Sequence, residues 1–124
     1  MEFEGNLYIK LKKFDDAIKS FNDGIKLQLY NGRYKGVMES NFGIAEAYLQ
    51  QNKIDSAIKY ANNVLELDKN YDFTLGVLNT YNLLYKAHKI KDFNNRKSSK
   101  EQTLNDLELI QRKIDAKLKS FRSN

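Results

Sequence analysis

Hydrophobic residues recur every three or four positions along most of the chain, which is the spacing of one face of an α-helix. One of these stripes joins Phe14, Ile18, Phe21 and Ile25. Polar turn residues separate one stripe from the next, as at Asn31-Gly32, where a glycine suits the end of a helix. The pattern predicts helices, and no strand, over about residues 2–11, 14–30, 33–50, 54–70 and 72–88.

One spacing occurs twice, 40 residues apart: Tyr8-x5-Phe14-x2-Ala17 and Tyr48-x5-Ile54-x2-Ala57. In each copy the tyrosine falls on one expected helix, and the bulky residue and the alanine fall on the next. A small alanine lets two helix backbones approach closely beside a tight turn. The recurrence at a fixed distance predicts a repeat protein, in which each helix pair buries its apolar face on the next pair.

The C-terminal part of the chain carries a further stripe, after residues 94–103, which have no large apolar side chain. Ser98-x2-Glu101 and Ser99-x2-Gln102 match capping boxes, so the last helix could begin near residue 99. Alternatively it begins at Asp92 as a long helix whose first turns stand in water, which we favour because repeats follow one another directly. Its stripe, called here the C-terminal stripe, consists of Leu104, Leu107, Ile110, Ile114, Leu118 and Phe121.

The C-terminal stripe can pair with another helix in two ways. In cis it would cap the last repeat, and in trans it would form the seam of a homodimer. We favour the cap, because a repeat array must cover the apolar face of its final repeat.

These spacings resemble the tetratricopeptide repeat (TPR) family over about residues 2–93. The third copy is degenerate, because Phe93 stands where the family has alanine. The positions that carry the resemblance in the first two copies are Gly5, Tyr8, Phe14, Ala17, Phe21 and Gly24, and then Ala45, Tyr48, Ile54, Ala57, Ala61 and Val64.

The resemblance implies an all-α fold, a right-handed superhelix of about three antiparallel helix pairs with a long C-terminal capping helix. We expect a single domain over 1–124, with repeat 1 at about 2–30, repeat 2 at about 33–69, and a degenerate repeat 3 plus the C-terminal helix at about 72–121. The 40-residue period is similar to that of TPR arrays in bacterial signalling and regulatory proteins. The array begins in mid-repeat, which suggests a piece of a longer protein.

The resemblance also implies a concave groove lined by the first helix of each pair. We expect a peptide or a partner helix to bind there, with contacts from Asn6, Lys10, Glu39, Phe42, Glu46, Leu49, Leu78, Asn82, Tyr85 and Lys86. Ile9, Gln50 and Leu75 fall on the same expected face. The family's carboxylate clamp, which grips a C-terminal carboxylate, is not matched, because only Asn6 agrees among its five positions and Glu2 has the wrong charge.

The composition fits a helical domain and excludes several other classes. The chain has 124 residues, 41% of them hydrophobic, and no proline, so it can build one core and is not disordered. It has no cysteine, which suits a reducing cytoplasm. We expect no membrane span and no signal peptide, because the apolar runs are short and the N-terminus is acidic.

The positive charge is concentrated in one segment. Residues 1–85 carry 10 basic and 11 acidic groups (net −1), residues 86–100 carry six and one (net +5), and residues 101–124 carry five and four (net +1), which sums to the total of +5. Basic segments bind nucleic acid, acidic partners or membranes, but they are more often solvated helix faces.

No pattern of a catalytic or metal site is present. His88 is the only histidine, and no second group is spaced to orient it as an acid or base. The glycines match no phosphate-binding loop. We therefore expect no enzymatic activity, cofactor or metal, and the resemblance to the TPR family implies a protein–protein interaction module that serves as the sensor or scaffold part of a bacterial regulator. The alternatives are binding of nucleic acid through residues Lys86–Lys100 and self-association through the C-terminal helix.

Overall fold

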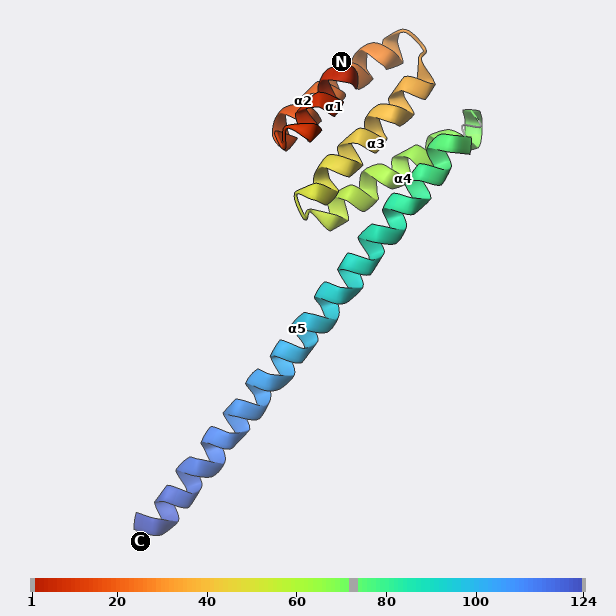
Figure 1. The fold of residues 1–124 in the computed structure, drawn as a ribbon. Helices are drawn as coiled ribbons and strands as arrows, with labels where there is room; N and C mark the ends of the chain where they lie inside the picture. Colours follow the sequence, from red (N-terminus) through yellow and green to blue (C-terminus); the bar gives the residue numbers. More distant parts are fainter. Residues whose placement is uncertain (1, 72–73, 124) are drawn as a thin grey trace. The chain divides into compact units, whose positions relative to one another are not determined.

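The computed structural model describes residues 2–71 and 74–123, and this part of the chain contains only helices and turns. An all-α fold with a long C-terminal helix is therefore confirmed. Residues up to Lys89 form one compact unit and those from Ile90 onward form another. The helices are α1 (Glu2–Lys10), α2 (Phe14–Tyr30), α3 (Tyr34–Gln50), α4 (Ile54–Tyr71) and α5 (Thr74–Ser123), as Figure 1 shows.

The first four helices form two successive helix pairs in the first unit. Helix α1 packs on α2, and α3 packs on α4, each pair joined by a tight turn (Figure 1). The pairs are joined through α2 and α3, and α1 also contacts α3. Each helix thus buries one face on its neighbour in the chain, as in a repeat array.

The three turns that separate α1 from α2, α2 from α3 and α3 from α4 have the same geometry. Each has one residue in the left-handed region, at Lys12 (φ 58°), Gly32 (φ 68°) and Asn52 (φ 61°). The residue after it donates its N–H to a carbonyl five positions back, which is the six-to-one bond of a Schellman motif. These bonds run from Lys13 to Tyr8 (2.8 Å), from Arg33 to Gln28 (2.8 Å) and from Lys53 to Tyr48 (2.9 Å).

The left-handed residues are spaced 20 residues apart, so the 40-residue repeat seen in the sequence consists of two equal halves. The same motif closes the turn within a repeat and the turn between repeats. A helix of 17 residues, such as α2 or α3, plus a three-residue turn fills each half.

The centre of the first unit is the ring of Phe21 on α2, which is fully buried. Gly5 of α1 and Gly43 of α3 face this ring, and both are buried. A Cβ atom at Gly5 would lie 2.6 Å from the ring, and one at Gly43 would lie closer still. Ile9, Ala17, Ile44 and Ala47 complete this cluster. The ring thus occupies the space that two missing side chains leave between α1 and α3.

The N-terminal part of α5 belongs to a second apolar cluster. Leu83 and Leu84 pack there with Ala45 of α3 and Ala61 of α4. Ala17 and Ala57, the alanines of the repeated spacing, are both fully buried, which confirms their predicted place between helices.

The C-terminal part of the chain differs from the expected fold in one respect. The expected fifth helix and the expected capping helix form one uninterrupted helix, α5, in which residues 94–103 are also helical. The expected start of this helix at Asp72 lies outside the described residues. Residues 94–103 thus continue the helix, as the favoured long-helix alternative predicts, and no new helix begins near residue 99. The physical reason is that residues 94–103 contain neither glycine nor proline to end a helix, and no large apolar side chain to dock a new one.

The turns yield a prediction, because their three left-handed residues differ in how well they tolerate a positive φ. Gly32→Ala should cost about 1–2 kcal/mol of unfolding free energy, since an L-residue is strained there. No atom lies within 4 Å of the position of the added Cβ, so only the backbone is tested. Lys12→Gly should instead stabilise the fold, by under about 1 kcal/mol, because the strain relieved exceeds the added chain entropy.

Urea unfolding followed by circular dichroism measures both changes. Asn52→Gly serves as an internal control with a smaller gain, since asparagine tolerates the left-handed region better than lysine. A Gly32→Ala variant as stable as the parent would show that this turn does not hold its left-handed conformation in solution.

The Phe21 cluster yields a second prediction. Gly43→Ala should destabilise the fold by about 1–3 kcal/mol, because the added methyl group overlaps a buried ring that Gly5 prevents from moving. The matched control is Gly76→Ala on α5, where no neighbour lies within 4 Å. That control should be neutral or stabilising, by at most about 1 kcal/mol, because alanine favours a helix over glycine. Equal thermal midpoints for the two variants would contradict the close contact.

Candidate functional site: the groove between α3 and α5

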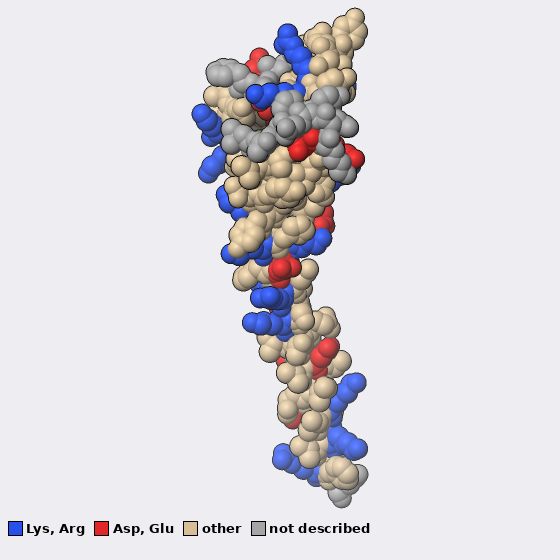
Figure 2. Space-filling view, turned by 90° about the vertical axis from the view of Figure 1, so that its right-hand side faces the viewer, with Lys and Arg blue, Asp and Glu red and all other residues tan. Residues whose placement is uncertain are grey.

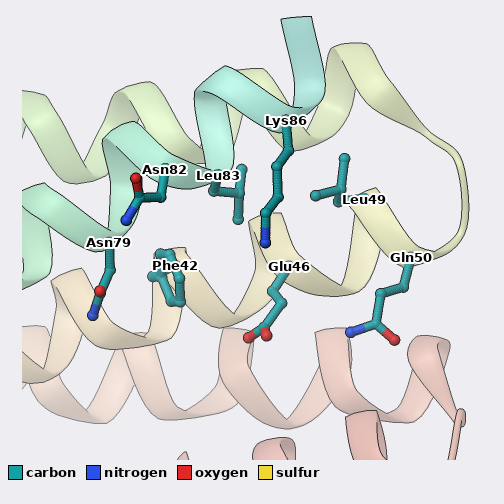
Figure 3. A pocket seen from close by; sticks show the side chains of 8 residues that line it. All are labelled: Phe42, Glu46, Leu49, Gln50, Asn79, Asn82, Leu83 and Lys86. Carbon is teal, nitrogen blue, oxygen red and sulfur yellow. The ribbon is translucent and has the colours of Figure 1, made fainter. Parts of the chain in front are cut away.

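The first unit contains an open hollow of about 380 Å³, called the groove here. Two helices line it, with side chains pointing into the space between them (Figure 3). Helix α3 supplies Phe42, Glu46, Leu49 and Gln50, and α5 supplies Asn79, Asn82, Leu83 and Lys86.

Helical spacing explains why these side chains meet. Phe42, Glu46 and Leu49 follow one another at intervals of four and three, so they share one face of α3. Asn79, Asn82 and Lys86 do the same on α5 at intervals of three and four. The two faces belong to helices that are already held together by the second apolar cluster.

The floor of the groove is apolar and its rim is polar. Leu83 is 5% exposed and belongs to the second cluster, and Phe42 and Leu49 pack against that cluster. Gln50, Asn79 and Asn82 are exposed around them. Side-chain amides both donate and accept hydrogen bonds, as a peptide group does. The groove can therefore take an apolar side chain and hydrogen-bond the main chain that carries it.

The groove also holds a carboxylate and an ammonium group from opposite sides. Lys86 extends from α5 toward Glu46 on α3 (Figure 3). Burial raises the pKa of Glu46 above its ordinary value of 4.5, and the positive charge of Lys86 opposes this rise. Because the net shift is upward, the ionised form of Glu46 is incompletely compensated in the free protein.

Five of the ten residues that the sequence predicted for a groove line this one: Phe42, Glu46, Leu49, Asn82 and Lys86. Leu78 and Tyr85 are exposed on α5 but do not line it. Each precedes a lining residue by one position, and this step of about 100° turns its side chain to another face. Asn6 and Lys10 on α1, and Glu39 on α3, are exposed elsewhere in the first unit.

Other groove assignments have mixed outcomes. Gln50, also expected on the groove face, does line it, whereas Ile9 is buried in the Phe21 cluster. The side chain of Leu75 lies outside the described part. Asn79 and Leu83 also line the groove, although the sequence did not predict them there. Their spacing could have indicated this position, because both share a helix face with Asn82 or Lys86 at intervals of three or four.

Among the described residues no group of histidine, cysteine, aspartate or glutamate side chains is arranged to hold a metal ion. None of the described helices combines the length and the apolar character that crossing a membrane requires. His88 is exposed on α5.

Comparison with known proteins identifies one family. The family model described as tetratricopeptide repeat matches residues 3–31 and 39–71, which are 29 and 33 residues and together half of the chain. The two matched segments correspond to the α1/α2 and α3/α4 pairs. No curated protein and no solved structure matches the chain.

The electrostatics of Glu46 yield a pH prediction. The pKa of Glu46 is higher in the folded state than in the unfolded state, so folding favours the protonated carboxyl. Its contribution to the free energy of unfolding is therefore fully present at low pH and is lost as the pH rises through the folded-state pKa. Glu46→Gln should therefore raise the free energy of unfolding at about pH 7.5, relative to the parent, and this gain should shrink toward about pH 4. Urea unfolding at the two pH values measures it.

Glu39→Gln is the matched control for that measurement, since Glu39 is exposed on the same helix and outside the groove. It should change the stability little at either pH. A Glu46→Gln variant that is less stable than the parent at neutral pH would mean that Lys86 outweighs the burial of the carboxylate.

Proposed function

The chain belongs to the tetratricopeptide repeat family, and from this premise we propose that it is a non-enzymatic module whose groove binds a peptide or a helix of a partner protein. Repeats of this family generally mediate protein–protein interactions. The observation that carries the finer proposal is the groove itself, an apolar floor with amide groups on its rim and one charge of each sign.

The lining residues indicate the chemistry of the partner segment. An apolar side chain would pack on Phe42, Leu49 and Leu83, because burying it there removes apolar surface from water. The side-chain amides of Asn79 and Asn82 would bond the main chain or polar side chains of the segment. A basic group of the partner near Glu46 would compensate the carboxylate further, so we expect a segment that combines apolar and basic residues.

As a wider part of the same proposal, the module serves as the scaffold or sensor part of a cytoplasmic regulatory protein. The support for this role is the 40-residue spacing of its repeats. The role requires that the groove be free to take up its partner reversibly, which suits an open hollow with exposed amides better than a closed cavity.

A peptide selected from a random phage-displayed library on the purified chain provides the probe for the proposal. Asn79→Ala and Asn82→Ala should each weaken its binding roughly two- to tenfold in isothermal calorimetry, the loss of one neutral hydrogen bond. Both side chains are exposed, so neither change should alter the thermal midpoint appreciably.

Lys59→Ala on α4 is the matched surface control, because Lys59 is exposed outside the groove, and it should leave the affinity unchanged. Equal losses from all three variants would contradict binding in the groove. A selection that yields no binding peptide, together with tight binding of an oligonucleotide that weakens steeply with salt, would instead indicate a nucleic-acid function for residues 86–100.

A further inference from the structure

The C-terminal part of α5 exposes an apolar stripe to water. Leu104, Leu107, Ile110, Ile114, Leu118 and Phe121, the C-terminal stripe, are between 47% and 70% exposed. A helix in water obtains most of its stability from packing one face on another element. We therefore expect this stripe to pack on a partner helix, and its spacing and neighbouring charges indicate which helix that is.

Five of the six residues of the C-terminal stripe fall on a heptad repeat. Residues 104, 107, 111, 114, 118 and 121 are spaced 3, 4, 3, 4 and 3, which are the a and d positions of a two-stranded coil. Ile110, the remaining residue of the stripe, lies at the flanking g position, and the one polar residue of the heptad series is Gln111. Its side-chain amide donates to the carboxylate of Asp115 at 3.0 Å. That bond gives this polar residue a partner on its own helix.

The charges along the same segment are divided between its two ends. Residues 101–108 carry three acidic groups and no basic one, net −3. Residues 112–122 carry five basic groups and one acidic, net +4. Basic side chains accordingly gather at the C-terminal end of α5 in Figure 2. Two copies laid parallel would place like charges side by side, whereas an antiparallel pair places the acidic end of each copy on the basic end of the other.

We propose that residues 101–122 of α5 pair with the same residues of a second copy as an antiparallel coiled coil. In this register Leu104 packs on Phe121 of the second copy, Leu107 on Leu118, and Gln111 on Ile114, so every a position meets a d position. At the flanks Glu101 of one copy lies near Arg122 of the other. The arrangement is self-complementary, as the two-fold symmetry of a homodimer requires.

The residues preceding the segment also disfavour a parallel pair. The heptad continued toward the N-terminus places Lys97 at an a position and Lys100 at a d position. In a parallel dimer each of these lysines would face its own copy across the seam, and like charges there repel. In the antiparallel register the paired segment begins beyond them. The proposal is independent of the groove, which uses only residues of the first unit.

The seam is tested with two leucines of the same helix. Leu107 and Leu109 are 56% and 51% exposed, but Leu107 is at a d position and Leu109 is on the outer f position. Sedimentation equilibrium of the full chain should show a dimer that Leu107→Asn weakens about a hundredfold or more, because two seam layers each lose a leucine. Leu109→Asn should leave the dimer intact. A monomeric parent chain, a trimer or tetramer, or equal effects of both variants would overturn the proposal.

The antiparallel orientation of the two helices is tested by cross-linking. Because the chain has no cysteine, an introduced cysteine is the only thiol that can react. A Glu101→Cys chain mixed with an Arg122→Cys chain and treated with a short bis-maleimide should give the mixed dimer in at least tenfold excess over either like-with-like product. A Lys113→Cys chain, at the outer c position, should cross-link poorly with any of them. Predominant products of 101 with 101 and of 122 with 122 would show a parallel pair and overturn the proposal.

Discussion

The contact on which the first unit depends is that of the Phe21 ring with two glycines. A helix backbone can lie directly against an aromatic ring only where the residue at the contact has no side chain. Gly5 on α1 and Gly43 on α3 meet this condition on the two sides of the Phe21 ring. The ring is fully buried, so its position fixes the separation of α1 and α3 across α2. Helix α3 also lines the groove, and the geometry of the candidate site therefore depends on a contact that Gly43 makes beside the groove residues of that helix.

The turns impose the second constraint. Because the left-handed residues at positions 12, 32 and 52 share one Schellman geometry, each helix leaves its predecessor at a similar angle. The equal lengths of α2 and α3, together with the shared turn geometry, set this regular interval through local structure alone. The 20-residue series does not extend to position 92, which lies within α5.

Much of this fold follows from local patterns that a sequence displays directly. The spacing from Tyr8 to Ala17 and its copy 40 residues later predict the helix pairs, and Asn31-Gly32 predicts a turn. The left-handed conformation of Lys12 could not be predicted, because lysine has no preference for it and adopts it only where the helices on both sides require it.

The groove was predictable only in part, for a related reason. A helical face can be assigned to within about one residue from spacing alone, so Leu78 was expected in place of Asn79, and Tyr85 was expected beside Lys86. The upward shift in the pKa of Glu46 depends on how far neighbouring helices cover it, which no local pattern records. The joining of two expected helices into α5 reflects the absence of a stop signal, and an absence is a weaker indication than a glycine or a capping box.

The Phe21 contact also bears on how the first unit unfolds. Repeat arrays with contacts only between neighbours can open one helix pair at a time. Here the ring of α2 is covered by residues of both α1 and α3, so detaching the first helix pair from the second uncovers the ring on one side and leaves a void against α3. We therefore expect the α1/α2 pair to open together with α3. Amide hydrogens of α1, although it is the shortest helix, should then exchange through the same cooperative event as those of α2 and α3.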